Sequence, residues 1–383
     1  MSLADALAAR LPAMLEDVQR IIECESPSDD LQANARSADV VADVLGARLA
    51  DAGLPREPER IVTEGVTHLR WRGGASTRVL LLGHHDTVWP LGSLEAHPCV
   101  IRDGVLTGPG CFDMAIGLVQ AAHAVAALAE RDGADAVAGV TILVTGDEEV
   151  GSSTSRGLLE DEARGAQAVF VLEAAGPAGA LKTQRKGTGM YTVMAKGRAS
   201  HAGLDPDRGV NAGLELAHQL LAVASLHQSG DGTTVVPTSG MIGSTANTVP
   251  EAASFAVDVR AGSAAELARI HTAITSLAPV TPGATIEVAG DVNRPPLERS
   301  MAAALFERAL RLAPVAGVTD LQECAVGGAS DGNFTGGLGV PTLDGLGGVG
   351  GGAHAADEHV EIEHVAPRAT LLALLVEDVL AHP

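Results

Sequence analysis

Short apolar runs that end in acidic or histidine side chains constrain this chain more than any other feature of its sequence. Each run has the length and residue types of a buried strand, and polar groups follow it at once. The carboxyl ends of parallel strands meet at one edge of a sheet, so these polar groups are expected to converge there. The runs and their polar groups are 79–82 with His84 and Asp86, 140–144 with Glu148 and Glu149, and 168–172 with Glu173.

The alternation of strand-like and helix-like segments predicts an α/β fold. Strands are expected near 67–72, 78–84, 138–145 and 168–172, and an alanine-rich buried helix is expected over Met114–Ala129. A strand–helix–strand order of this kind predicts a mostly parallel sheet flanked by helices. The other expected elements of this part are helices over 3–24, 36–53, 300–312 and 366–381, and strands near 320–324 and 340–343.

A different pattern begins after about residue 183 and predicts an inserted α+β domain. Four strands and two helices are expected there, which is typical of a compact unit of this size. We therefore expect a catalytic domain formed by 1–183 and 294–383, an inserted lid or dimerisation domain formed by 184–293, and a linker over 291–296. The strands are expected at Met190–Lys196, at Thr234–Val236 with Gly240–Ile242, at Ser254–Arg260 and at Thr285–Val288, and the helices at Asn211–Ala224 and Ala264–Leu277.

The net charge and the cysteine pattern indicate which binding partners the protein can have and in which cellular compartment it is found. The formal charge of −22, from 26 basic and 48 acidic residues, argues against nucleic acid or an anionic membrane, because both require a basic face. No apolar stretch is expected to span a bilayer, and the N-terminus lacks the pattern of a signal peptide. The four cysteines form no CxxC pair, which favours free thiols in a reducing compartment over a thiolate zinc site. We therefore expect a soluble, cytoplasmic protein.

The sequence Gly83–Thr87 places a histidine and an aspartate two residues apart at the end of a strand. Residues two apart on a strand point to the same side, so His84 and Asp86 are expected to lie together while His85 points away. One ring nitrogen of His84 could bind a metal ion while Asp86 accepts a hydrogen bond from the other, which would fix the tautomer.

Four further acidic or histidine residues follow strands or glycine-rich turns. Asp113 ends a Gly-Pro-Gly turn, where glycine lets the backbone approach a ligand closely. Glu148 and Glu149 follow a buried strand, and crowded carboxylates repel one another unless a cation is present. One glutamate could then bind the metal while the other serves as general base. His354 closes the glycine-rich stretch 347–353.

Taken in this order, the motifs resemble the dinuclear-zinc exopeptidases and amidohydrolases. This family includes glutamate carboxypeptidase, acetylornithine deacetylase, succinyl-diaminopimelate desuccinylase and aminoacylase. The resemblance covers essentially the whole chain, and the run 86–92 is similar to the glutamate carboxypeptidase branch. The matching motifs are GHHDTV (83–88), GPGCFDM (108–114), GDEEVGS (146–152), SHAG (200–203) and GGGAH (350–354), together with Glu173 at a strand end.

The resemblance implies a role for each residue of the metal centre. One zinc ion would be bound by His84 and Glu173 and the other by Glu149 and His354, with Asp113 as the bridging ligand. Asp86 would orient His84, Glu148 would be the general base, and the Asp113–Met114 peptide would be cis. One departure from the family is Ala115, because the family often has lysine after the methionine.

The resemblance also implies groups that handle the substrate. His201 would stabilise the oxyanion, and in the family this histidine often reaches the active site of the other subunit of a homodimer. Arg294 would bind a substrate carboxylate through its planar guanidinium, and Asn247 would add an amide hydrogen bond. Gly351 and Gly352 would let the substrate lie against the main chain.

The implied reaction is zinc-dependent hydrolysis of an amide bond next to an amino-acid carboxylate, with an N-acyl amino acid or peptide as substrate. An alternative within the family is N-acyl-amino-acid deacylation in amino-acid or secondary metabolism. A non-catalytic protein on the same fold also stays open, although it would be expected to have lost the base or ligands that this chain retains. The third alternative is a site with one metal ion, or with Co²⁺ or Mn²⁺ in place of zinc.

Overall fold

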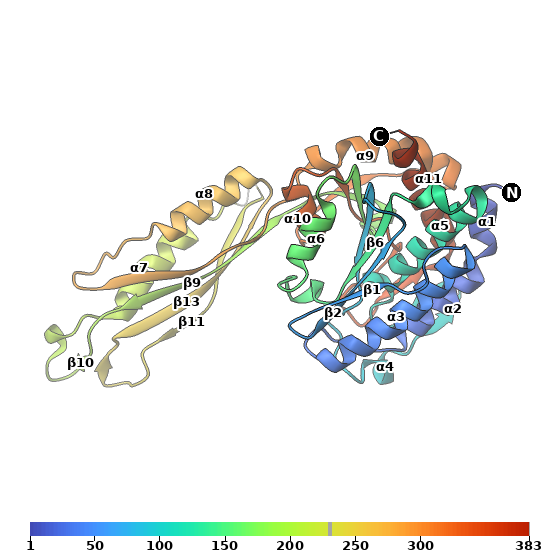
Figure 1. Cartoon of the computed structure of the whole chain (residues 1–383). Helices are drawn as coiled ribbons and strands as arrows, with labels where there is room; N and C mark the ends of the chain where they lie inside the picture. Colours follow the sequence, from blue (N-terminus) through green and yellow to red (C-terminus); the bar gives the residue numbers. More distant parts are fainter. Residues whose placement is uncertain (229–231, 383) are drawn as a thin grey trace. The chain divides into compact units, whose positions relative to one another are not determined.

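The structure is a computed structural model that describes residues 1–228 and 232–382. The chain divides into two compact units, which can be followed by colour in Figure 1. Unit 1 contains Met1–Gln184, Arg299–Val326 and Ser330–Pro383, and unit 2 contains Arg185–Glu298 with Gly327–Ala329. Unit 2 is thus inserted in the sequence of unit 1, and each unit has its own hydrophobic core.

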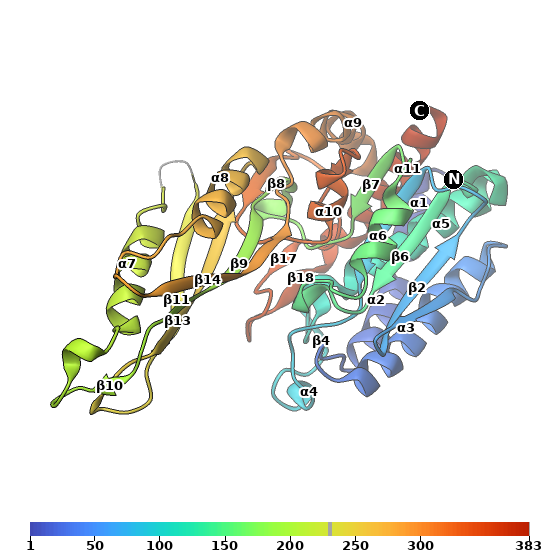
Figure 2. The same ribbon diagram turned by 60° about the vertical axis from the view of Figure 1, so that its left-hand side comes forward.

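A six-stranded sheet with the order β1-β2-β6-β3-β7-β16 forms the centre of unit 1 (Figure 2). β3 pairs in parallel with β6 and β7, β7 pairs in parallel with β16, and the β1–β2 and β2–β6 pairs are antiparallel. β3, β6 and β7 are buried along their whole length, which explains their continuous apolar sequences. The strands are β1 (Glu59–Thr63), β2 (Val66–Arg72), β3 (Val79–His84), β6 (Val140–Thr145), β7 (Ala168–Val171) and β16 (Thr342–Leu343).

Helices cover both faces of this sheet, because successive side chains of a strand point to opposite sides. Val79, Leu81 and Phe170 belong to the larger core, which includes residues of α1, α2, α3, α5, α9 and α11. Leu80 and Leu82 belong to the smaller core on the other face, with residues of α6 and α10. The helices are α1 (Leu3–Ala9), α2 (Leu11–Ile22), α3 (Leu31–Asp51), α4 (Ser93–Ala96), α5 (Ile116–Asp132), α6 (Arg156–Ala163), α9 (Arg299–Ala316), α10 (Gly332–Gly337) and α11 (Val365–Ala381).

Short strands and helices form the connections of unit 1. A four-stranded sheet has the order β17-β18-β5-β4, and β8 pairs with β15. The strands are β4 (Val100–Arg102), β5 (Val105–Thr107), β8 (Leu181–Arg185), β15 (Glu323–Val326), β17 (Gly350–Gly351) and β18 (His359–Glu361). The short helices are η1 (Cys111–Ala115), a π-helix before α5, and the 3₁₀ turns η2 (Ala134–Val137), η3 (Glu148–Val150), η4 (Pro177–Gly179) and η7 (Ile362–His364).

The segment Cys111–Asp132 is long and apolar enough to cross a membrane by length and composition. The expectation that no stretch of the chain meets this test was therefore wrong. In the structure, 94% of the most apolar window of this segment is buried inside the protein, and α5 packs against α3 and α11. These are the properties of a core helix, because a helix that is apolar on all sides must be buried.

Unit 2 is a four-stranded antiparallel sheet with two helices. The strand order is β11-β13-β9-β14, and the side chains of β9 and β13 alternate between buried and less buried positions. α7 and α8 pack against this sheet and complete the core of the unit. The elements are β9 (Gly187–Lys196), β10 (Ser200–His201), η5 (Pro206–Arg208), α7 (Ala212–Ala224), β11 (Thr234–Ile242), β12 (Thr248–Val249), β13 (Ala252–Ala261), α8 (Ala264–Thr275) and β14 (Thr285–Arg294).

The fold class predicted from the sequence is confirmed, with three corrections to single elements. The helix expected over 3–24 is two helices, because Pro12 lies in the first turn of α2 and favours a helix start there. The two strand segments expected between 234 and 242 form one strand with a bulge. The linker expected over 291–296 was wrong in its first four residues, because β14 continues to Arg294 along β9.

The polar sequence of β14 explains this error. Most of its side chains are partly or fully exposed, so the strand lacks the apolar pattern that would identify it. Beyond β14, Leu297 pairs with Arg185, and both residues belong to unit 2. The chain passes between the units at 184/185, 298/299, 326/327 and 329/330.

Candidate metal centre

Strand ends and loops of unit 1 bring five acidic and histidine side chains together. His84 is the last residue of β3, and Glu173 lies two residues beyond β7, which is parallel to β3. Glu149 lies in η3 after β6, Asp113 in η1 before α5, and His354 in the loop between β17 and β18. The sheet topology brings His84, Glu149 and Glu173 together, because the carboxyl ends of parallel strands share one edge of the sheet. Asp113 and His354 come to this edge from connecting segments.

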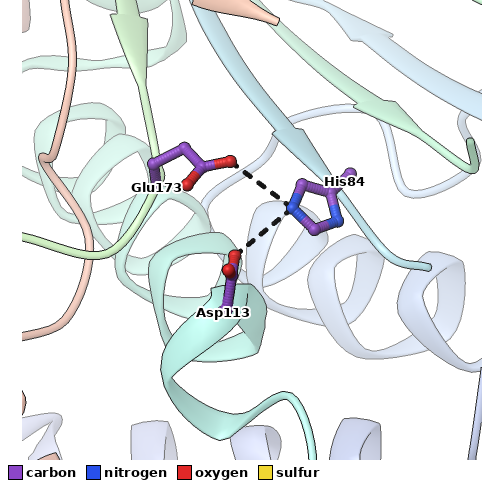
Figure 3. A group of neighbouring side chains, drawn as sticks. All are labelled: His84, Asp113 and Glu173. Atoms are coloured by element: carbon purple, nitrogen blue, oxygen red, sulfur yellow. Dashed lines mark ion pairs between the residues drawn. The ribbon is translucent and has the colours of Figure 1, made fainter. Parts of the chain in front are cut away.

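His84, Asp113 and Glu173 form the first of two groups (Figure 3). The Nε2 atom of His84 lies 3.5 Å from Asp113 Oδ1 and 3.5 Å from Glu173 Oε1. His84 and Glu173 are buried, and neither His84 Nε2 nor Asp113 Oδ1 has a hydrogen-bond partner among the described residues. Buried polar atoms are nearly always paired, so these atoms indicate a missing partner such as a cation.

His354, Asp113 and Glu149 form the second group. The Nε2 atom of His354 lies 3.2 Å from Asp113 Oδ2 and 3.2 Å from Glu149 Oε1. Asp113 therefore offers one carboxylate oxygen to each group. The Asp113–Met114 peptide is cis, as the resemblance implied.

The spacing of these atoms fits a pair of divalent cations. In each group the ligand atoms lie within 4.8 Å of one another. Tetrahedral zinc holds nitrogen and oxygen ligands at about 2.0–2.1 Å, which puts neighbouring ligand atoms about 3.3 Å apart. The ion-pair distances of 3.2 and 3.5 Å in the two groups match this spacing. The residues present therefore fit two metal ions that share Asp113.

Electrostatics at the site favour positive charge between the carboxylates. Burial alone would lower the pKa of His84, but its carboxylate neighbours, Asp113 first, raise that pKa well above the usual histidine value. Asp113 and Glu149 raise the pKa of His354 to about 10. Burial would raise the pKa of Asp113, but the two histidines hold it below its usual range, whereas burial keeps the pKa of Glu149 raised. Crowded carboxylates of this kind favour a bound cation.

Asp86 holds the segment that carries the two glutamates. Its carboxylate accepts hydrogen bonds from the backbone N–H groups of Glu148 and Glu149, each at 3.2 Å, and from Ser28 Oγ at 2.7 Å. The Nδ1 atom of His84 lies 2.9 Å from the backbone carbonyl oxygen of Asp86 and 3.5 Å from its carboxylate. The nearest acceptor for His84 Nδ1 is thus the backbone carbonyl oxygen of Asp86. The carboxylate of Asp86 accepts hydrogen bonds from the β6–η3 turn instead.

His201 and Asn247 lie side by side in unit 2, where the backbone oxygen of Asn247 accepts the N–H of Ala202 at 2.9 Å. His201 is exposed, and its Nδ1 accepts the backbone N–H groups of Gly203 and Leu204 at 3.2 and 3.1 Å. A nitrogen that accepts hydrogen bonds carries no proton, so Nε2 is the ring nitrogen left to donate. His201 can therefore present Nε2 as a hydrogen-bond donor.

The other residues predicted to contact substrate, Arg294, Gly351 and Gly352, are less exposed to solvent than His201. Arg294 is the last residue of β14 and is buried, opposite Thr188 of β9. Gly351 pairs with His359. Gly352 has a φ of +73°, and a Cβ there would lie 2.6 Å from the carbonyl of Asp357. The close approach of the main chain thus requires glycine at 352, whatever the substrate.

Two charged residues near the centre were missed by the sequence analysis. Lys182 Nζ lies 4.0 Å from Glu173 Oε2, although nine positions separate the two in the chain. The buried carboxylate of Glu358 accepts the backbone N–H of Asp113 at 3.0 Å. Its position four residues after His354, just beyond the GGGAH motif (350–354), was the available signal, whereas nothing in the sequence places Lys182 beside Glu173.

Comparison with known proteins gives matches over most of the chain. The sequence model described as Peptidase family M20/M25/M40 matches residues 80–378. Carboxypeptidase G2 of Pseudomonas sp. strain RS-16 is 27% identical over 380 residues, which cover 96% of this chain and 89% of that protein. A succinyl-diaminopimelate desuccinylase of Burkholderia vietnamiensis is 27% identical over 371 residues, which cover 88% of this chain and 93% of that protein.

A solved structure supports the same fold. The M20 family metallo-carboxypeptidase Sso-CP2 from Sulfolobus solfataricus superposes with a TM-score of 0.70 and a sequence identity of 15%. The superposition covers 97% of this chain and 99% of that chain, so the likeness of fold includes both units.

Removal of divalent metal is expected to lower the thermal stability of this protein. A ligand that binds only the folded state at 100 times its Kd stabilises it by about 2.7 kcal/mol. Scanning calorimetry with a chelator and with added Zn²⁺ should therefore give different melting temperatures for the wild-type chain. Asp113→Ala, which removes the shared ligand, should melt at the same temperature in both conditions. A wild-type chain indifferent to chelator and zinc would contradict the metal centre.

Proposed function

The chain belongs to peptidase family M20/M25/M40, whose members are metal-dependent hydrolases, and we propose that it is a two-zinc enzyme that hydrolyses an amide bond next to an amino-acid carboxylate. The observation that carries this proposal is the division of the Asp113 carboxylate between two groups of ligand atoms. We assign His84 and Glu173 to one metal ion, Glu149 and His354 to the other, and Asp113 to both. Co²⁺ or Mn²⁺ could take the place of zinc, because carboxylate-rich sites accept several divalent ions.

Two metal ions at this site would supply Lewis acidity, which lowers the pKa of water from 15.7 toward roughly 7 and polarises a carbonyl oxygen. Glu148 acts as the general base in this proposal. It accepts a proton from the attacking water and gives that proton to the leaving amine. Its burial in η3, next to the ligand Glu149, and the hold of Asp86 on its backbone N–H support this role.

His201 provides the second donor to the oxyanion in this proposal. Because its Nδ1 accepts two backbone N–H groups, its Nε2 can donate a hydrogen bond to the oxygen that gains negative charge. Such a donor stabilises the transition state by about 3–4 kcal/mol. We propose that His201 acts on the substrate held by the partner subunit of a homodimer.

An exposed apolar surface on unit 2 supports the homodimer. β11 is an edge strand of the described sheet, and α7 packs beside it. Leu214 and Leu221 of α7 and Met241 and Ile242 of β11 are between 60% and 74% exposed. An edge strand next to an apolar helix face is suited to pair with a second copy of itself.

The substrate proposed is an N-acyl amino acid or a peptide with a free carboxylate. The guanidinium of Arg294 could bind that carboxylate with two parallel hydrogen bonds. Asn247, whose backbone oxygen accepts the N–H of Ala202 next to His201, could add an amide hydrogen bond. The name of the relative carboxypeptidase G2 supports cleavage beside a terminal carboxylate. The name of the desuccinylase relative supports the alternative, which is removal of an acyl group from an amino acid.

Glu148→Ala is expected to lower turnover about 10²–10⁴-fold, because general acid–base catalysis contributes a factor of this size. Two metal ions should stay bound to the variant. Amine release from a panel of N-acyl amino acids and dipeptides measures turnover, and mass spectrometry of the native protein counts the metals. Glu57→Ala, at a carboxylate 80% exposed, is the matched control and should behave as wild type. Wild-type turnover by the Glu148→Ala variant would show that the base is assigned wrongly.

A mixture of His201→Ala and Glu148→Ala subunits is expected to regain activity. Each mixed dimer would contain one site with an intact base and an intact partner histidine. Random exchange makes about half of the dimers mixed, so about a quarter of wild-type activity should return. If the remixed subunits stay as inactive as the separate variants, His201 does not act across a dimer.

Arg294→Ala is expected to raise KM for substrates with a free carboxylate about 10–100-fold, because a charge-assisted hydrogen-bond pair is lost. Substrates with that carboxylate amidated should be hydrolysed equally by the variant and the wild type. Arg299→Ala, at the exposed start of α9, serves as the control. Equal KM increases for both substrate types would mean that Arg294 acts through the fold and not on the carboxylate.

A further inference from the structure

Glu358 is a buried carboxylate surrounded by N–H donors. It is 3% exposed and follows the turn that begins at Gly352. Its Oε1 accepts the backbone N–H groups of Phe112 and Asp113, both at 3.0 Å. Its Oε2 accepts the backbone N–H of Gly110 at 2.9 Å and the indole Nε1–H of Trp89 at 2.8 Å. Each of the two carboxylate oxygens of Glu358 thus accepts two hydrogen bonds, all of them from N–H groups that can only donate.

These four donors belong to segments that carry proposed metal ligands. Asp113 itself supplies one of the N–H groups, and Trp89 lies five residues after His84, in the loop that leaves β3. Glu358 lies four residues after His354, in the same β17–β18 connection. One carboxylate therefore joins three ligand-bearing segments that are far apart in the sequence.

The chain is built to bring Glu358 to this place. The main chain turns back at Gly352, where a Cβ would lie 2.6 Å from the carbonyl carbon of Asp357 and 2.7 Å from the backbone nitrogen of Glu358. A Cβ at Gly110 would lie 2.7 Å from Cγ2 of Thr87, so the Asp113 loop also approaches the β3 loop closely. The two glycines allow the three segments to meet around the carboxylate.

Only an ionised carboxylate satisfies four donors at once. Each carboxylate oxygen can accept two hydrogen bonds, whereas the amide group of glutamine would turn two N–H donors of its own toward the donors already present. Replacement by glutamine keeps the size and shape of the side chain, but it removes the negative charge and puts an NH₂ group in place of one acceptor oxygen. The donors left without acceptors would then be buried, which is costly.

We propose that Glu358 is a positioning residue for the metal centre, which fixes the backbone of Asp113 relative to the loops of His84 and His354. This inference rests on the proposed two-metal function. Groups that orient metal ligands control affinity, and their loss typically weakens metal binding about 10–100-fold. Because Asp113 is shared, the effect should reach both metal ions.

The test is a titration of metal-free protein with Co²⁺ alone. Isothermal titration calorimetry measures the affinity, and visible absorption spectra record the coordination of the bound Co²⁺. Glu358→Gln is expected to weaken Co²⁺ binding about 10–100-fold and to change the absorption spectrum. Glu162→Gln is the matched control, because Glu162 is equally buried in unit 1 but pairs with Arg70 and Arg72, on a different part of the sheet. It should lower the melting temperature and leave the affinity and spectrum unchanged.

Wild-type Co²⁺ affinity and spectrum in Glu358→Gln would overturn the inference, as would an equal loss in Glu162→Gln. If Glu358→Gln does not fold, Glu358→Asp is measured in its place, since it keeps the charge but shortens the reach by one methylene. Weaker Co²⁺ binding by that variant supports the inference, and wild-type binding contradicts it. A wild-type chain that binds fewer than two Co²⁺ ions would instead show failure of the proposed function.

Discussion

The sharing of one aspartate between two histidine-containing groups is the interaction on which the rest of this structure depends. Asp113 turns one carboxylate oxygen toward His84 and the other toward His354. Three carboxylates and two imidazoles in one place would repel one another or trap protons, and the raised pKa values of both histidines express that demand for positive charge. Two divalent cations bound here would meet the same demand and would supply the Lewis acidity that a hydrolase needs.

In unit 1, strand ends position some of the metal-centre residues, and hydrogen bonds from buried carboxylates restrain the segments that carry others. The parallel strands β3, β6 and β7 end at a common edge and deliver His84, the Glu148–Glu149 turn and Glu173. Loops deliver Asp113 and His354, and loops need additional restraint to hold a position. Buried carboxylates supply it, since Asp86 binds the backbone of the β6–η3 turn and Glu358 binds the backbone of the Asp113 loop.

Much of the fold and the metal centre could be predicted from the sequence, because the signals were local. Buried strands such as 79–84 were recognisable as apolar runs, and the motifs around His84, Asp113 and His354 identified the family that the comparisons then confirmed. β14 was partly mistaken for a linker, because an exposed edge strand has no apolar pattern. Lys182 and Glu358 were missed, because their roles follow from neighbours nine to more than two hundred positions away.

The most direct measurement of the central claim is anomalous diffraction at the zinc edge from crystals of the zinc-loaded protein. The account predicts two peaks in each chain. One should lie between His84 and Glu173, the other between Glu149 and His354, and each should contact a different oxygen of Asp113. A single peak, or peaks that leave Asp113 bound on one side only, would contradict the account.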